Sequence, residues 1–119
     1  MGVYVFALGD YIKIGKYAKK NPWSRVAHRG FKSVRCPPEI KNLTKQQQVE
    51  RLKLVAWFPD LKAYHEKAAH KYMKKHRVLG EWFRRSALDR ALQFLNSKGA
   101  QAKVLSQHKT QAKKTRRRL

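Results

Sequence analysis

The chain has 119 residues, the length of about one domain. Its 29 Lys and Arg residues against 7 Asp and Glu give a formal net charge of +22, while a hydrophobic content of 42% excludes a wholly disordered chain. No apolar run is long enough to span a membrane, the N-terminal segment lacks the pattern of a secretory signal, and a lone cysteine, Cys36, fits an intracellular, reducing compartment. Because such a charge repels itself unless a polyanion neutralises it, we expect a nucleic acid as partner, with an anionic membrane surface a distant second.

The first elements in the chain are those of a β-hairpin. Residues 3–8 (VYVFAL) are continuously apolar, and residues 11–14 alternate between apolar and polar side chains. Gly9 and Asp10 between them form a turn pair that favours a tight hairpin. We expect the second strand to end at Gly15.

A short helix and an irregular segment are predicted next. Asn21 is suited to the N-cap, and Pro22 to the first helical position, where its missing N–H costs nothing. We expect this helix to end near Gly30. Residues 36–38 (CPP) predict a loop, and the polar residues 41–48 predict irregular structure.

Residues 51–58 (RLKLVAWF) alternate again and predict a third, half-buried strand. The alternation places four residues together on one face: Leu52, Leu54, Ala56 and Phe58.

Two helices are predicted in the second half of the chain. Asp60 is a candidate cap for a helix over residues 61–77, and residues 81–83 (EWF) could form a strand fragment. Ser86 is a candidate cap for the last helix, which we expect to end at residues 97–99. Its apolar residues follow the i, i+3, i+4, i+7 spacing of an amphipathic helix: Leu88, Ala91, Leu92 and Leu95.

This order of elements predicts an α+β fold, with a small three-stranded antiparallel sheet flanked by helices over residues 1–98. Residues 99–119 are predicted to form a basic C-terminal arm, because residues 103–119 hold seven bases and neither an acid nor an aromatic residue. The arm could lie along phosphates, act as a nuclear or nucleolar address, or merely add charge as a solvated tail.

Several motifs in this order resemble those of the GIY-YIG nuclease superfamily. The first motif is present as GVY at residues 2–4, and the second as KIG at residues 13–15, where the family usually has tyrosine in place of the lysine. Residues 25–28 (RVAH) are similar to the family's arginine-bearing helix. The pattern from Glu66 to His70, followed by Glu-Trp-Phe at residues 81–83, is similar to a small phage- and virus-type branch. The resemblance covers roughly residues 2–95.

The resemblance implies a set of catalytic residues for phosphodiester hydrolysis. Tyr4 would activate or orient the attacking water, and Arg25 would hold the non-bridging phosphate oxygens, for which its planar guanidinium is suited. Glu66 would bind a single divalent ion, Mg²⁺ or Mn²⁺, with water at the other coordination positions. Lys16 would neutralise the phosphate, and His28 would transfer a proton or donate to the phosphate.

Further basic residues are predicted to contact nucleic acid without reading its sequence. They are Lys13, Arg29, Lys103, Lys109, Lys113, Lys114, Arg116, Arg117 and Arg118.

Each assignment has a structural alternative. Tyr4 could be an ordinary core residue, and Glu66 could pair with Lys62 or His70, each four residues away on the same helix face. His70 could instead fix the position of its neighbours. A zinc site on His65 and His70 is disfavoured, because a separation of five residues places them about 140° apart on a helix.

Two functions of different classes follow. The first is a divalent-metal-dependent DNA endonuclease, which could pair on its substrate to cut both strands and could be encoded by a virus or phage. The alternative is a non-catalytic structural protein that binds ribosomal RNA or a packaged genome on the same fold. The high charge suits both functions, whereas Tyr4, Arg25 and Glu66 together favour the enzyme.

Overall fold

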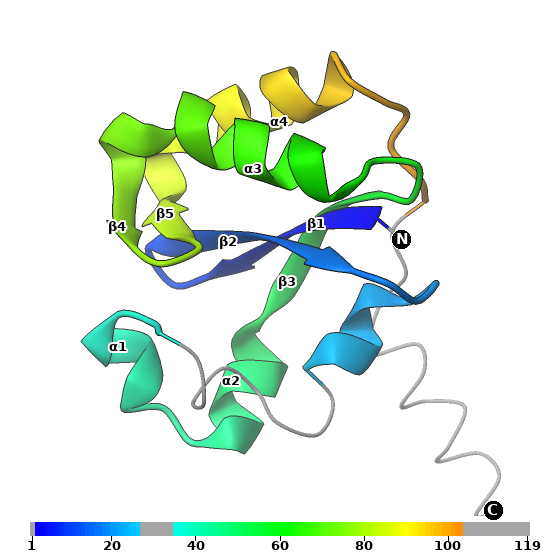
Figure 1. Cartoon of the computed structure of the whole chain (residues 1–119). Coiled ribbons are helices and arrows are strands. Elements are labelled where there is room, and N and C mark those ends of the chain that lie inside the picture. The colour runs from blue at the N-terminus through cyan, green and yellow to red at the C-terminus, as the bar shows by residue number, and fades with distance from the viewer. Residues whose placement is uncertain (1, 27–34, 104–119) are drawn as a thin grey trace, which may run out of the picture.

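The computed structural model describes residues 2–26 and 35–103, and in this part the chain forms one sheet with helices on both faces (Figure 1). The five strands of the sheet have the order β3-β1-β2-β5-β4, and every neighbouring pair is antiparallel. The predicted α+β class is therefore confirmed. The prediction of three strands was wrong, because a second hairpin extends the sheet beyond β2. The strands are β1 (Gly2–Leu8), β2 (Tyr11–Tyr17), β3 (Lys53–Phe58), β4 (Arg77–Leu79) and β5 (Trp82–Arg84).

The helices separate into two groups in space. α3 and α4 cover one face of the sheet, and α1, α2 and the single turn η1 lie on the other (Figure 1). The α-helices are α1 (Pro38–Lys41), α2 (Lys45–Arg51), α3 (Ala63–Tyr72) and α4 (Leu88–Asn96). The 3₁₀ turns are η1 (Pro22–Arg25), η2 (Lys74–His76) and η3 (Arg85–Ala87).

The predicted N-terminal hairpin is confirmed. Leu8 pairs with Tyr11 across the turn, where Gly9 has a φ of +59° that glycine adopts readily. The second strand does not end at Gly15 as predicted but runs on to Tyr17, because Gly15 still pairs with β1.

Strand β3 departs from the alternation that its sequence predicts. Leu54 lies against Phe6 in β1 and Ala56 lies against Val5, so that Val55 is an extra residue in the ladder. Because of this bulge, the side chains that precede Val55 and those that follow it alternate out of step, so that Leu54 and Ala56 point to opposite faces of the sheet. Leu54 therefore packs below the sheet, whereas Ala56 packs with the core beneath α3 and α4.

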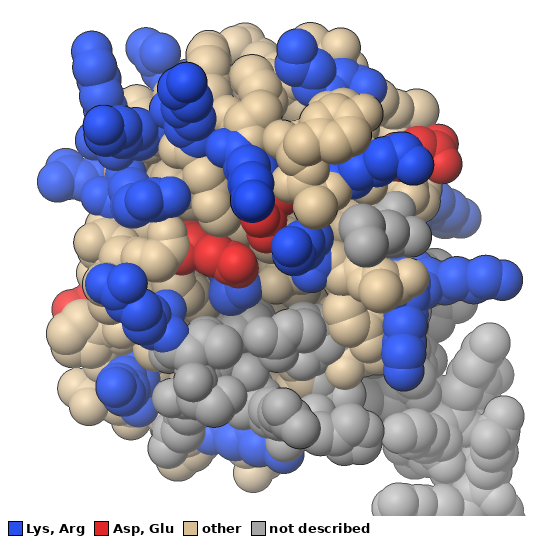
Figure 2. Space-filling view, viewed as in Figure 1, with Lys and Arg blue, Asp and Glu red and all other residues tan. Residues whose placement is uncertain are grey.

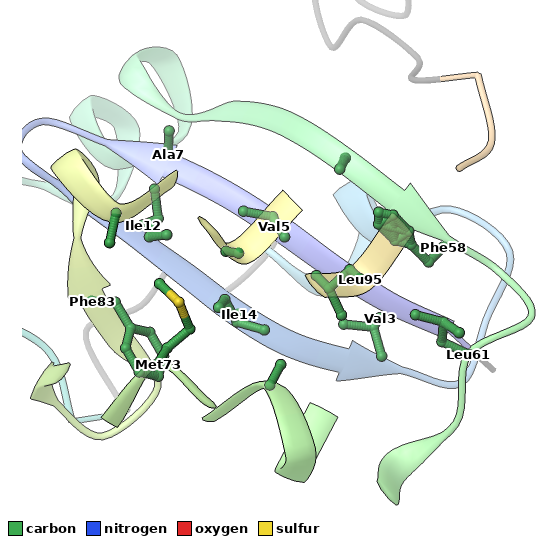
Figure 3. Close-up of a cluster of buried hydrophobic side chains, with 14 residues drawn as sticks. Val3, Val5, Ala7, Ile12, Ile14, Phe58, Leu61, Met73, Phe83 and Leu95 are labelled. Carbon is green, nitrogen blue, oxygen red and sulfur yellow. The ribbon is translucent and has the colours of Figure 1, made fainter. Parts of the chain in front are cut away.

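Each face of the sheet is covered by its own hydrophobic core. The core under α3 and α4 includes Val3, Val5, Ile12 and Ile14 of the hairpin, together with Leu95 of α4 (Figure 3). The other core includes Tyr4, Phe6, Trp57 and Trp82 from the strands, together with Ile40 of α1. Residues 3–8 are continuously apolar because alternate residues of β1 enter both cores.

The short helix after the hairpin begins as predicted. The side chain of Asn21 accepts a hydrogen bond from the amide of Trp23 at 3.0 Å, and Pro22 is the first helical residue. The expected end near Gly30 lies outside the described residues. Pro38, which we expected in a loop, begins α1.

Residues 41–48, predicted to be irregular, include the start of α2. The Thr44 hydroxyl accepts from the amide of Gln47, and the Gln47 side chain accepts from the amide of Thr44, forming a capping box. The side-chain Nε2 of Gln48 then donates to the carbonyl of Ile40 at 2.9 Å, which ties α2 to α1. A polar sequence can thus form a helix when its polar groups cap the helix and join it to its neighbour.

The helix predicted over residues 61–77 is shorter than expected. α3 begins at Ala63, and the amide of Lys62 donates to Nδ1 of His65 at 2.9 Å, so that Asp60 is not its cap. The chain leaves α3 at Tyr72 and returns through η2 into the β4–β5 hairpin. Its turn contains Gly80, with a φ of +58°.

The strand fragment expected at residues 81–83 is confirmed as β5, displaced by one residue. α4 carries the four predicted apolar residues on its core side, but Ala87 occupies the N-cap position in place of Ser86. Within the described residues, no helix is long and apolar enough to cross a bilayer.

Candidate active site

Tyr4 lies across the backbone of β2 at the position of Gly15. The two residues are direct partners in the β1–β2 ladder, and Tyr4 is 1% exposed. A Cβ atom added to Gly15 would lie 2.5 Å from Cζ of the Tyr4 ring, which is closer than such atoms approach. A residue larger than glycine at position 15 would therefore collide with the Tyr4 phenol. This contact joins the two motifs that carried the family resemblance.

The ammonium group of Lys13 is buried between a phenol and a carboxylate. Its Nζ donates to the Tyr4 hydroxyl at 2.8 Å and to Oε1 of Glu81 at 2.5 Å, and the residue is 2% exposed. We predicted that Lys13 contacts nucleic acid, and the structure places its charge inside this cluster. A buried ammonium needs such partners, because an unpaired charge in the interior is costly.

The position of Glu81 follows from the sheet. The backbone carbonyl of Glu81 accepts a hydrogen bond from the amide of Ile14 at 3.1 Å. The next residue, Trp82, begins β5 and pairs with Lys13 of β2. The carboxylate of Glu81 is 41% exposed, so that the Lys13–Glu81 ion pair links the buried phenol to the surface.

Glu66 is a second carboxylate beside this group, and it points inward from α3. It is 5% exposed, and its Oε2 atom accepts no hydrogen bond from the described residues. Burial raises the pKa of Glu66, as does the negative charge of Glu81, while His70, Lys16 and Lys13 oppose the increase. Of the predicted alternative partners Lys62 and His70, neither donates a hydrogen bond to Oε2, but the charge of His70 favours the ionised form of Glu66.

His70 connects α3 to β2. Its Nε2 lies 2.7 Å from the carbonyl of Ile14, and because a carbonyl can only accept, Nε2 carries a proton and donates. The imidazole ring also packs against Phe83 at a centroid distance of 5.3 Å. His70 therefore holds the helix of Glu66 against the strand of Lys13, which favours the positioning role among the alternatives.

The other predicted site residues are placed as follows. Lys16 is exposed on β2 and close enough to Glu66 to affect its pKa. The backbone of Arg25 ends η1, whereas His28 and Arg29 lie outside the described residues. Lys103 is exposed at the end of the described chain. The remaining predicted arm contacts lie outside it: Lys109, Lys113, Lys114, Arg116, Arg117 and Arg118.

The quoted motifs contain Lys13 and Glu81, but sequence reasoning did not foresee that Lys13 binds both Tyr4 and Glu81. A two-residue turn fixes the hairpin register, which makes Gly15 the partner of Tyr4 and Lys13 the partner of Phe6. Lys13 is thus a diagonal neighbour of Tyr4 on the same face, and this could have been read from the hairpin alone. The position of Glu81 could not have been read from the hairpin, because it depends on the pairing of β2 with β5, two strands that are far apart in the chain.

The residues present fit a divalent metal of the kind that the family resemblance implies. Mg²⁺ binds carboxylate oxygens and keeps several waters, and one or two protein carboxylates are enough. Oε2 of Glu66 is a buried carboxylate oxygen that accepts no hydrogen bond from the described residues, and Glu81 is close enough to raise the pKa of Glu66. Glu66 would hold such an ion, and Glu81 is the second carboxylate whose charge acts on Glu66.

Comparisons of the whole chain with protein-family models, with curated proteins and with solved structures found no significant match in any of the three.

Proposed function

We propose that the chain is a divalent-metal-dependent endonuclease that hydrolyses phosphodiester bonds in DNA. The observation that carries this proposal is the buried carboxylate of Glu66, whose Oε2 has no donor among the described residues and which is close to Lys13 and Lys16. A buried carboxylate that accepts too few hydrogen bonds raises the free energy of the folded protein, unless a bound ligand interacts with it. The net charge of +22 favours a polyanionic substrate.

The contacts of Tyr4 support a role as the base that acts on the attacking water. Lys13 donates to the Tyr4 hydroxyl oxygen, and a donating ammonium stabilises negative charge on that oxygen. Tyr4 in its phenolate form would take a proton from the water as the water oxygen bonds to phosphorus. The bond to the sugar oxygen would break, and this oxygen would leave as an alcohol after taking a proton from solvent water. Glu81 would balance the charge of Lys13 and keep it in place.

Two other residues would act on the phosphate itself. Lys16 is exposed beside Glu66 and would neutralise the non-bridging oxygens, as would Arg25 in the family's pattern. A Mg²⁺ ion held by Glu66 would supply further positive charge for the phosphate in the transition state.

The experiment is a nicking assay on supercoiled plasmid with Mg²⁺, with Mn²⁺ and with EDTA. We expect nicking that needs the metal and that falls at least about a hundredfold in Glu66→Gln and Tyr4→Phe, because removing one such electrostatic contact costs about 10²–10³ in rate. Glu50→Gln is the matched control, since it makes the same change on an exposed carboxylate of α2. Plasmid binding without nicking in the wild-type protein would contradict the proposal.

A non-catalytic nucleic-acid-binding structural protein is the second candidate. Its support is the near-complete burial of Tyr4 and Lys13, at 1% and 2% exposed, which also suits an internal hydrogen bond that only stabilises the fold. In that case the same assay gives tight binding in EDTA and in Mg²⁺ alike, with no cut products.

A further inference from the structure

A row of exposed lysines lies on α3 beside the candidate active site. Lys67 follows Glu66 directly, so it is turned about 100° from that carboxylate around the helix, and Lys71 is turned about 140° in the same sense. Both lysines are exposed, and exposed Lys74 continues the row at the start of η2.

The other flank of α3 is occupied by α4. Tyr72 is turned about 120° from Glu66 in the opposite sense, and its ring stacks on Phe94 of α4 at a centroid distance of 4.7 Å. Lys67 and Lys71 therefore lie on the flank that faces away from α4 and toward solvent. Figure 2 shows this face of the molecule, where basic side chains gather over α3 and around acidic side chains near its centre.

None of these lysines forms an ion pair in the part of the chain that the structure describes. The acid of α3 is Glu66, which is buried, and the ion pair found there joins Lys13 to Glu81 and does not involve α3. Lys67 and Lys71 are four residues apart, a spacing at which like charges destabilise a helix. A repulsive row that forms no ion pair with the described residues is suited to an external polyanion.

We propose that Lys67, Lys71 and Lys74 form a phosphate track along α3, which guides one nucleic-acid strand to the carboxylate of Glu66. Lys67 and Lys71 are separated by a rise of about 6 Å along the helix axis, and Lys74 extends the row by about one further turn, so that the row is long enough to contact the phosphates of two to three successive nucleotides. The proposal rests on the proposed function only in treating the bound strand as the substrate.

The test compares two triple variants with the same loss of charge. The track variant carries Lys67→Gln, Lys71→Gln and Lys74→Gln. The control variant carries Lys41→Gln, Lys45→Gln and Lys53→Gln, which are exposed residues of α1, α2 and β3. Dissociation constants for duplex DNA, single-stranded DNA and duplex RNA are measured in EDTA over a range of NaCl concentrations, so that cleavage does not interfere.

We expect the track variant to bind at least one of these nucleic acids at least tenfold more weakly than the control variant does. For duplex DNA, a loss of three phosphate contacts would lower the magnitude of the log–log salt slope by about 3. The melting temperature of the track variant should not fall below that of the wild-type protein, because the variant relieves repulsion within α3. Equal binding by the two variants to all three nucleic acids would overturn the proposal.

The outcome can be separated from that of the nuclease proposal. If the track variant binds weakly while the wild-type protein never nicks plasmid, the track stands as a nucleic-acid surface and the enzyme is refuted. If the wild-type protein nicks plasmid while the two triple variants bind equally well, the enzyme stands and the track is refuted.

Discussion

The carboxyl group of Glu66 is held in a place that favours its neutral form. Its pKa is raised first by burial and then by the charge of Glu81. The folded protein therefore binds a proton at Glu66 more tightly than the unfolded chain does. Between the ordinary pKa of a glutamate and the raised value, the free energy of unfolding must fall as pH rises.

We predict that Glu66→Gln, measured in EDTA, unfolds at a higher temperature than the wild-type protein at pH 7.5. The difference should shrink toward zero as the pH is lowered to about 4, where the unfolded glutamate is also protonated. Thermal unfolding of both proteins across this pH range tests the prediction, with Glu50→Gln as the exposed control. A wild-type protein that is more stable than Glu66→Gln at pH 7.5 would show that the fold uses this charge.

The contact between Tyr4 and Gly15 gives a second prediction at the residue scale. Gly15→Ala should lower the free energy of unfolding by about 1–3 kcal/mol, because the new methyl group overlaps the ring of Tyr4. The same change should cost clearly less in a Tyr4→Val background, where the ring is absent, but not in a Tyr4→Phe background, where the ring remains.

Urea unfolding of the single and double variants measures this coupling. Equal costs of Gly15→Ala in the wild-type and Tyr4→Val backgrounds would mean that the methyl group is accommodated in another way.

The sequence was sufficient to select part of the candidate site. Tyr4, Gly15 and Glu66 were named from motifs, and the structure brings the first two into contact, with Glu66 close to Lys13. Lys13 was predicted to contact nucleic acid, whereas the structure shows its ammonium group buried and bound to Tyr4 and Glu81. Its burial depends on Glu81, an acid 68 residues away whose position is set by the pairing of distant strands.

At the scale of elements, local signals predicted local structure. The hairpin and the start of η1 depend on turn and capping residues that are adjacent in sequence, and they were predicted correctly. The prediction that Leu52, Leu54, Ala56 and Phe58 share one face of β3 was wrong, because the pairing of β3 with β1 contains a bulge at Val55. α2 was missed because its residues are polar, although the capping box from Thr44 to Gln47 was a readable signal.

At the scale of the whole molecule, net charge links stability to binding. A charge of +22 destabilises the compact state by self-repulsion, and salt screens this repulsion. Salt also weakens the attraction to a nucleic acid by reducing the gain from counterion release. A higher salt concentration must therefore raise the stability of the free protein and lower its affinity for nucleic acid.

We predict that the melting temperature of the free protein rises between 50 and 500 mM NaCl, while its affinity for duplex DNA falls. If about eight phosphates are neutralised, the log–log slope of affinity against salt should be near −7. Differential scanning calorimetry and fluorescence anisotropy on one preparation test both parts. A slope near zero would exclude phosphate neutralisation as the source of affinity.

The strand order β3-β1-β2-β5-β4 has a consequence for how the protein reaches its folded state. The β1–β2 hairpin is local in sequence and can form early, but each of its strands needs a second neighbour from much later in the chain. Such pairings raise the contact order and slow folding. During synthesis, Tyr4 and Lys13 therefore leave the ribosome long before Glu81 can balance the ammonium charge. The last hairpin to be made completes the environment of the first.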